Sequence, residues 1–313
     1  MLDVRAVEVF EDARPRLEAI AYRLLGSASD AEDAVQDTYL RWQAAERGYV
    51  ETPEAWLTKA LSNVCLNQLT SARVRRESYV GQWLPEPILA GDRMLGPADT
   101  VEQRESVSIA ILTVLERLSP AERVVYVLRE AFGYSHNEIA EILERTESGC
   151  QQLYRRAKQH VAADRTRVPV DEAAARKIVE EFLAAALSGN TDSLVRLLGD
   201  DVTHIGDGGG YVPAAARPFV GVRAVARFLR GIFIPTAGKR NLLGGSPAFF
   251  AAVVNAAPAL VAVVEGRVAG VITLDTTPEG IAALHTQVNP DKLVRFTRQW
   301  STVERGRPLL ESW

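Results

Sequence analysis

Apolar and polar residues alternate with a helical period through the first half of the chain. The clearest segment spans residues 118–161. In it, Ser119 with Glu122 and Ser135 with Glu138 have the spacing of a capping box, where each side chain satisfies the other residue's backbone N–H. Each pair precedes a run of apolar residues at helical spacing. The segment is therefore predicted to contain two short helices, with a third following a turn at Arg145–Thr146.

The third helix has an apolar side and a polar, basic side. Its apolar positions recur at intervals of three, four and four and are Cys150, Leu153, Ala157 and Val161. Its other side carries Gln151, Gln152, Arg155, Arg156 and Lys158. This is typical of a helix-turn-helix, whose last helix enters the major groove, where glutamine can pair with adenine and arginine with guanine. An amphipathic hairpin with a solvated charged face is the structural alternative.

Two more amphipathic helices are predicted ahead of this segment, over residues 7–25 and from a Ser29/Glu32 capping box onward. The second should bury Ala31, Ala34, Val35, Thr38, Tyr39 and Trp42. Its opposite side is a polar stripe that includes Asp33, Gln36 and Asp37. That stripe is either a solvated face or a contact surface for another protein.

A further helix should begin at Thr52–Pro53. Its polar side carries the amides Asn63 and Asn67 and then an arginine cluster of Arg73, Arg75 and Arg76. Amide-rich surface next to arginines suits single-stranded or melted nucleic acid.

Residues 77–105 contain several prolines and glycines and predict an extended linker. Within it, Trp83–Pro87 reads WLPEP and comprises Trp83, Leu84, Pro85, Glu86 and Pro87. This stretch is too apolar for a free linker. It is either a local anchor on its own domain or, as we favour, a docking peptide for another domain.

From Val170 onward the pattern changes to helices followed by strands. Helices are predicted over 170–187, 191–198 and 222–233, and strands over 201–205, 259–265, 267–276 and 280–288, with a glycine-rich turn at 206–210. This order predicts an α+β domain with helices on one face of an antiparallel sheet.

Charge and cysteine content narrow the function classes. The net charge is −4, and residues 1–168 carry 21 Lys and Arg against 26 Asp and Glu. Because phosphate contacts supply most non-specific affinity, the isolated chain should bind DNA weakly and need a larger DNA-binding machine. Cys65 and Cys150 fall on apolar helix faces, which supports neither a disulfide framework nor a thiolate metal site. The absence of a signal-peptide core or an apolar span of bilayer length predicts a cytoplasmic protein without a membrane segment.

Residues 30–42, 53–69 and 118–161 together resemble successive regions of an extracytoplasmic-function sigma factor of RNA polymerase. The resemblance implies that the first stretch docks on the β′ clamp helices, the second captures the melted −10 element, and the helix-turn-helix, beside the β flap, reads the −35 element. Asp33, Gln36 and Asp37 then become polymerase contacts. The implied −10 contacts are Asn63, Asn67, Arg73, Arg75 and Arg76, and the implied −35 contacts are Gln151, Gln152, Arg155, Arg156 and Lys158.

The segment from Val170 resembles the SnoaL-like, ketosteroid-isomerase-type cone fold. WLPEP and the later motif NPDKL are signatures of sigma factors that carry such a fused domain. NPDKL comprises Asn289, Pro290, Asp291, Lys292 and Leu293. The chain is accordingly divided into sigma region 2 (1–76), a linker (77–105), sigma region 4 (106–165) and a SnoaL-like domain (170–313). The resemblance implies control by the fused domain, through NPDKL close to WLPEP, with no separate anti-sigma factor.

Polyketide cyclases and isomerases of the cone fold use carboxylates and histidines as acid and base. The candidates in this chain are His204, Asp207, Tyr211, Asp275 and His285. No spacing fixes them around one substrate, so we expect no enzyme, cofactor or metal site. Three alternatives remain: a DNA-binding regulator independent of polymerase, an enzyme with a DNA-binding appendage, and a sensor of a small ligand in the cone cavity.

Overall fold

The computed structural model describes residues 4–46, 50–77, 79–96, 101–161 and 171–313, without side chains at 72–77, 101 and 102. Within these residues the chain forms two compact units, each described by itself. The N-terminal unit comprises 4–77, 91–107 and 111–161, and the C-terminal unit comprises 79–90, 108–110 and 171–313. The predicted linker is therefore divided: Tyr79–Ala90 belongs to the C-terminal unit, whereas Glu77, the end of α3, and the part from Gly91 belong to the N-terminal unit.

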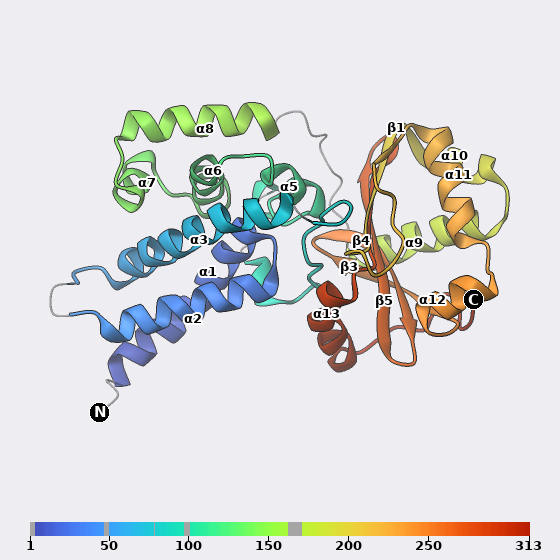
Figure 1. Ribbon diagram of the computed structural model, residues 1–313, viewed down its shortest axis with the longest axis horizontal. Coiled ribbons are helices and arrows are strands. Elements are labelled where there is room, and N and C mark those ends of the chain that lie inside the picture. Colours follow the sequence, from blue (N-terminus) through green and yellow to red (C-terminus); the bar gives the residue numbers. More distant parts are fainter. Residues whose placement is uncertain (1–3, 47–49, 78, 97–100, 162–170) are drawn as a thin grey trace. The chain divides into compact units, whose positions relative to one another are not determined.

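The first half of the chain is helical (Figure 1). Its elements are α1 (Val4–Leu25), α2 (Ala28–Ala44), α3 (Pro53–Glu77), η2 (Arg93–Leu95), α4 (Val101–Glu105), α5 (Ile109–Leu115), α6 (Pro120–Phe132), α7 (His136–Leu143) and α8 (Glu147–Val161). Helices α1, α2 and α3 pack on one another, and α8 packs on α6 and α7. The two helical groups also meet, because α3 contacts both α6 and α7.

Local signals fix most helix ends. The capping boxes at Ser119 and Ser135 are both formed, and Gly133, at φ +72°, ends α6. The predicted start of α2 is wrong. Ser27, not Ser29, is its cap, because the Ser27 backbone is extended and its Oγ accepts the Asp30 N–H at 3.1 Å.

The second half of the linker is held against α1. The fully buried Arg23 donates to the carbonyl oxygen of Leu95 at 2.6 Å and to Ser106 Oγ at 2.9 Å. Burial lowers the pKa of this guanidinium to about 10. Gly96 has φ +64°, and a Cβ there would lie 2.7 Å from the Cβ of Ala19. A side chain at position 96 would therefore push the linker away from α1.

The C-terminal unit is built on a six-stranded sheet in the order β2-β1-β6-β5-β4-β3. Its elements are α9 (Glu172–Leu187), α10 (Thr191–Val195), β1 (Leu198–Asp207), β2 (Phe219–Val220), α11 (Val222–Phe233), α12 (Ala237–Leu243), β3 (Ala248–Val254), β4 (Ala257–Val264), β5 (Arg267–Thr277), β6 (Gly280–Gln287) and α13 (Pro290–Thr302). The helix 222–233 and the three late strands agree with the sequence prediction to within a few residues.

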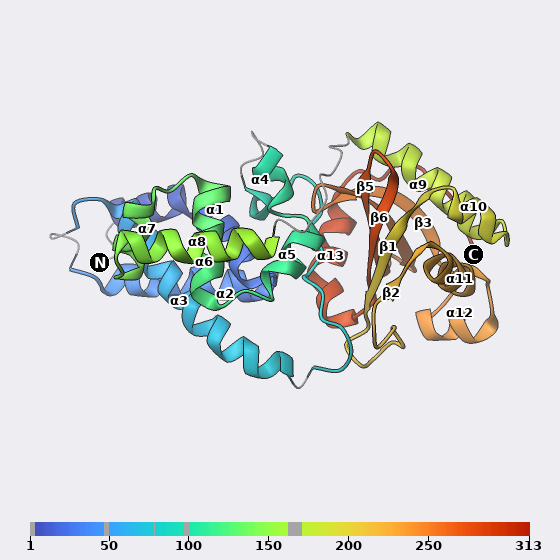
Figure 2. The same ribbon diagram turned by 90° about the horizontal axis from the view of Figure 1, so that it is seen from above.

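Three features of the predicted C-terminal layout are wrong. The sheet is mixed, because β1 and β6 pair in parallel. Helices also cover both faces (Figure 1, Figure 2): α9 and α11 pack on one, while α13 lies on the other. On that second face, α13 buries Leu293, Phe296 and Trp300 against a cluster that includes Val261 and Val271. β1 also begins at Leu198 and runs through Asp207, so the glycine-rich turn is shorter than predicted.

Candidate promoter-binding surfaces and linker clamp

The polar stripe predicted on α2 is exposed. Asp33, Gln36 and Asp37 all lie on the surface, while Val35 on the opposite side is buried. The same stripe continues one turn later with Leu40, whose side chain is 53% exposed. Residues spaced by three, four and seven share one helix face, so acidic, amide and apolar groups form one contiguous surface.

The predicted nucleic-acid residues of α3 are only partly described. Asn67 is exposed, and Asn63, one turn earlier, is half-buried. Arg73, Arg75 and Arg76 fall in the last turns of α3, but their side chains lie outside the described part of the chain. The neighbouring Cys65 is fully buried, which raises the pKa of its thiol to about 12.

The outer face of α8 divides into two groups. Gln152, Arg155 and Arg156 are exposed on adjoining positions of one face. By contrast, Gln151 donates to Glu147 Oε1 at 3.2 Å, and Lys158 donates to the Tyr154 hydroxyl at 3.2 Å. The first three residues present their polar groups to solvent.

The helix-turn-helix is held rigidly around its turn. Glu144 ends α7 at φ +52°, and Thr146 Oγ1 accepts the N–H of Gly149 in the first turn of α8. The motif is also tied to α3, since Thr58 Oγ1 lies 3.1 Å from the Tyr134 hydroxyl and Lys59 Nζ lies 3.0 Å from Glu144 Oε1. The −10 and −35 candidates are thus parts of one packed unit.

In the C-terminal unit, a group of buried polar side chains holds the first half of the linker; we name Asp207, Gln287, Asn289 and Lys292 the linker clamp. Asp207, at the end of β1, is fully buried. Its Oδ2 accepts the Leu84 N–H at 2.9 Å and Lys292 Nζ at 2.7 Å.

The other oxygen of Asp207 completes the clamp. Oδ1 accepts the Tyr79 hydroxyl at 2.6 Å and the Gly209 N–H at 3.0 Å. Asn289 Nδ2 in turn donates to the Tyr79 oxygen at 2.8 Å. Burial and the bond to Asp207 raise the pKa of Tyr79, so its hydroxyl stays protonated and acts as a donor.

The NPDKL motif is the start of α13. Asn289 is the N-cap, with its Oδ1 accepting the Asp291 N–H, and Pro290 occupies the first helical turn. Lys292 donates to the Leu84 carbonyl oxygen at 2.7 Å, and its ammonium lies 4.2 Å from the ring centre of Trp83. Leu293 is buried in the core beneath α13.

The remainder of the WLPEP region also lies on this unit. Pro85 provides a carbonyl oxygen 3.4 Å from Gln287 Nε2, and Glu86 and Pro87 are buried. Beyond them the chain pairs with the edge of β3, where Ala90 N–H donates to Val253 O at 3.0 Å and Ile88 O accepts from Asn255 N–H at 2.9 Å. The WLPEP and NPDKL motifs therefore lie next to each other within the C-terminal unit.

Sequence reasoning missed three residues of this contact: Tyr79 within the linker, and Gln287 and Asn255, which hold the linker. Asn255 Oδ1 accepts the Ile88 N–H at 2.8 Å. Asp207 was selected from the sequence for a different reason, as a possible catalytic acid. Tyr79 lies close to WLPEP in the sequence and Gln287 close to NPDKL, so proximity to a motif could have identified both. No local feature of the sequence identified Asn255.

The catalytic candidates do not converge on one site. A cavity of about 360 Å³ lies in the C-terminal unit, lined by His204 but not by Asp207, Asp275 or His285. Tyr211 is 63% exposed, and His285 Nδ1 lies 3.2 Å from Asp275 Oδ2 within the sheet. Among the described residues there is no cluster of side chains suited to a metal ion and no helix long and apolar enough to cross a bilayer.

Comparison with known proteins matches this geometry to a family. Models of Sigma-70 region 2 and of Sigma-70, region 4 match residues 9–75 and 108–161. The chain is 40% identical over 227 residues to ECF RNA polymerase sigma factor SigJ of Mycobacterium tuberculosis, an alignment that covers 72% of each chain. The chain belongs to the extracytoplasmic-function sigma factors.

The likeness reaches beyond the sigma regions. The probable ECF RNA polymerase sigma factor SigI of Mycobacterium tuberculosis is 32% identical over 286 residues, covering 90% of this chain and 92% of SigI. The crystal structure of the M. tuberculosis extracytoplasmic function sigma factor SigJ superposes with a TM-score of 0.70 at 32% identity. It covers 95% of this chain and 100% of that one. This sigma factor therefore combines helical sigma regions with a SnoaL-like α+β domain, and acts as an alternative sigma factor in transcription initiation with core RNA polymerase and promoter DNA as its partners.

Proposed function

We propose that three surfaces of the N-terminal unit carry out promoter-directed initiation. The α2 stripe of Asp33, Gln36 and Asp37 binds the β′ clamp helices of core polymerase. The polar side of α3 binds the melted −10 element, and the helix-turn-helix, beside the β flap, binds the −35 element. The exposure of Asp33, Gln36 and Asp37 on α2, of Asn67 on α3 and of the outer face of α8, opposite buried apolar residues, supports the assignment.

Within α8 we assign base reading to Gln152, Arg155 and Arg156, because their side chains are exposed, whereas Gln151 and Lys158 bond to other side chains of α8. Gln151 and Lys158, which have partners inside the protein, have supporting roles. Arginine and glutamine can each pair bidentately with a base edge, at roughly 1–3 kcal/mol of discrimination per pair.

Run-off transcription with purified core polymerase tests this assignment. The double variant R155A/R156A should lose initiation at a cognate promoter by about 100-fold or more, while R227A/R230A, which removes two exposed arginines of α11, should keep it. Equal activity of both double variants would refute a −35 role for α8. A gel shift without polymerase that is as strong as with it would instead favour a polymerase-independent regulator.

We further propose that the SnoaL-like domain regulates initiation in cis through the linker clamp. The proposal rests on the contacts of the two halves of the linker. Residues 79–90 bind to Asp207, Lys292 and the β3 edge, and η2 binds to α1 through Arg23. A linker held along its length cannot also extend to space the two promoter-reading regions. Release of the clamp therefore changes how far apart those regions can move.

Point variants of the full chain test the regulatory proposal. Trp83→Ala and Lys292→Met remove the cation–π contact and the clamp ammonium and should both change run-off output, whereas Arg298→Ala on the exposed part of α13 should not. Unchanged output from both clamp variants would overturn cis regulation.

We propose that this control operates in the cytoplasm, without catalysis, cofactor or a separate anti-sigma factor. The lack of convergence among the catalytic candidates supports a non-enzymatic domain. Regulation by purified components alone is the test: if the clamp variants behave as the wild type until a second cellular protein is added, an anti-sigma factor is required.

A further inference from the structure

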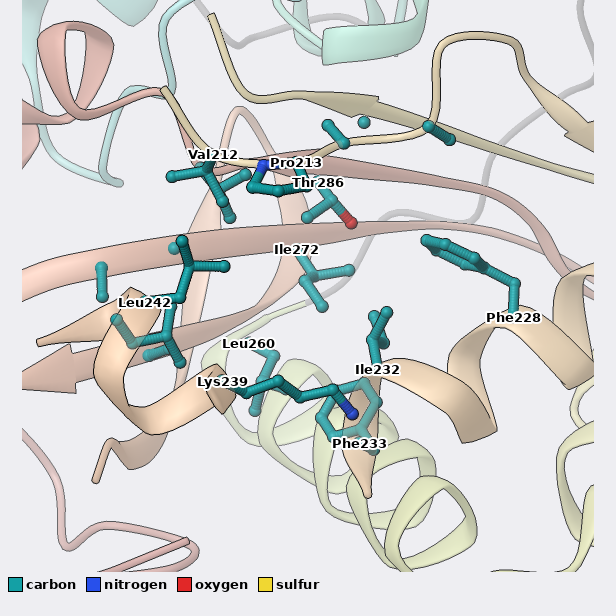
Figure 3. A pocket seen from close by; sticks show the side chains of 18 of the residues that line it. Val212, Pro213, Phe228, Ile232, Phe233, Lys239, Leu242, Leu260, Ile272 and Thr286 are labelled. Carbon is teal, nitrogen blue, oxygen red and sulfur yellow. The ribbon is translucent and has the colours of Figure 1, made fainter. Parts of the chain in front are cut away.

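The cavity of the C-terminal unit has the size of a small-molecule site. Its volume is about 360 Å³, and it is lined from the sheet and from α11 and α12. Figure 3 shows Val212, Pro213 and Thr286 on one side and Lys239 and Phe233 on the other. Since an engineered cavity of about 150 Å³ holds benzene, this one has room for about ten to fifteen non-hydrogen atoms. Small-molecule pockets begin at about 300 Å³.

The wall is apolar except at His204, Thr286 and Lys239. Apolar side chains from the sheet and helices dominate the lining and include Phe228, Ile232, Phe233, Leu242, Leu260 and Ile272. His204 is 1% exposed, and its Nε2 lies 2.9 Å from Thr286 Oγ1. Its Nδ1 is buried and has no hydrogen-bond partner among the described residues. This nitrogen is closed off even from a molecule the size of water, so the group that can meet a ligand is the Thr286 hydroxyl, which lines the cavity. A hydroxyl can make more than one hydrogen bond, so Thr286 Oγ1 marks a place for a ligand hydroxyl or carbonyl beside its bond to His204.

The cavity offers little to a charged ligand. Burial lowers the pKa of His204 to about 4, so its imidazole is neutral at physiological pH. Lys239 is the one charged residue among those that line the cavity, and its ammonium donates to the carbonyl oxygens of Gly231 and Ile234. An anion entering the cavity would therefore lose hydration without gaining a dedicated partner.

We propose that this cavity binds an uncharged, compact, apolar molecule of about ten to fifteen non-hydrogen atoms with one hydroxyl or carbonyl group, and that its binding strengthens the linker clamp. The effect on transcription rests on the proposed cis regulation, whereas the binding itself does not.

One loop joins the cavity to the linker. Val212–Ala215 line the cavity, and the next residue, Ala216, accepts the Gln82 Nε2–H at 3.1 Å through its carbonyl oxygen. Near the start of the loop, Gly209 N–H donates to Asp207 of the clamp. A ligand packed against residues 212–215 favours the loop position in which Ala216 contacts Gln82 and Gly209 contacts Asp207. Because the ligand contacts this loop position better than any other, its binding is coupled to the linker clamp.

The strand after the cavity provides a second connection. Thr286 and Val288 line the cavity, whereas the alternate residues Gln287 and Asn289 belong to the clamp. Successive side chains of a strand point to opposite faces, so one short segment carries both sites. A shift of this segment on ligand binding therefore also moves the clamp residues Gln287 and Asn289 on its other face.

Calorimetric titration of the full chain with 2-naphthol, a neutral ring system with one hydroxyl, tests the binding. Saturable one-to-one binding is expected. Ala262→Leu places extra side-chain atoms in the cavity and should weaken binding at least tenfold, whereas the same change at the exposed Ala224 of α11 should leave it unaltered. Thr286→Val, which keeps the shape of the wall, should weaken binding about fivefold through loss of its hydroxyl. Thermal midpoints within a few degrees of wild type verify that the variants fold.

Three results would overturn the binding proposal: no saturable binding up to the solubility limit of 2-naphthol, equal binding by Ala262→Leu, or tighter binding of the anion 2-naphthoate. Coupling is read by hydrogen exchange of residues 79–90, where 2-naphthol should increase protection about tenfold in wild type and not in Ala262→Leu. Binding without a change in protection overturns the coupling. If cis regulation fails, the results differ: 2-naphthol still binds and still increases the protection of residues 79–90, but Trp83→Ala and Lys292→Met leave transcription unchanged.

Discussion

Replacing Asp207 by asparagine should release the linker without unfolding the C-terminal unit. The carboxylate is fully buried, and Lys292, the partner of its Oδ2 at 2.7 Å, is only 11% exposed. Asparagine preserves the shape but removes the charge, and turns one acceptor towards the Leu84 N–H or the Tyr79 hydroxyl into a donor. The buried ammonium is left without its counter-charge.

The size of the effect follows from these contacts. Removing one partner of a buried ion pair costs about 3–5 kcal/mol. The lower end applies because Lys292 keeps the Leu84 carbonyl oxygen and the face of the Trp83 ring. About 3 kcal/mol corresponds to a shift of roughly 100-fold between docked and released linker, at 1.36 kcal/mol per factor of ten.

Hydrogen exchange followed by mass spectrometry measures the shift directly. In Asp207→Asn, protection of residues 80–90 should fall about 100-fold while that of β5 stays at the wild-type level. Asp200→Asn, an exposed change on the same strand, is the matched control and should alter neither. Adding Lys292→Gln to Asp207→Asn should recover at least ~1 kcal/mol, because the unpaired ammonium is gone. Unchanged protection of 80–90, or an equal loss in β5, would refute the clamp mechanism.

Three other substitutions probe features on which this reading depends. Gly96→Ala should destabilise the N-terminal unit by about 2–4 kcal/mol in urea unfolding, because of both its positive φ and its close approach to α1. Gly81→Ala, also at positive φ but with open space around it, should cost only about 1 kcal/mol, and equal losses would exclude a steric role. Arg23→Ala should cost about 3 kcal/mol by the same measurement because it removes the buried donor to the Leu95 carbonyl oxygen and to Ser106 Oγ. An effect below ~1 kcal/mol would contradict the packing of η2 on α1. The pKa of His204 in the folded protein, about 4, lies below the ordinary 6.5, so its neutral form stabilises the fold fully above pH 6.5. As the pH falls toward 4, this contribution to the free energy of unfolding is lost, by roughly 3 kcal/mol. His204→Leu should remove this pH dependence, whereas His160→Gln, at an exposed position, should keep it.

Much of the N-terminal unit was determined by short-range information. A capping box acts between residues three apart, and an apolar stripe repeats within one or two turns, so α6, α7 and the buried side of α8 followed from sequence. The exposed faces followed as the complement of the buried ones. The start of α2 was misplaced because Ser27 and Ser29 are both good caps, and only backbone geometry selects between them.

The clamp and cavity were decided by tertiary structure. Asp207, followed by three glycines, looks like a turn residue, yet its donors come from positions 79–84 and 287–292, about 80 or more residues away. The parallel pairing of β1 with β6 and the docking of α13 on the second face bring those segments together, and neither leaves a local periodic signal. Motifs could therefore identify the residues of the linker and α13, but only long-range packing shows that a buried carboxylate joins them, because the interaction energy depends on burial and distance rather than on sequence spacing.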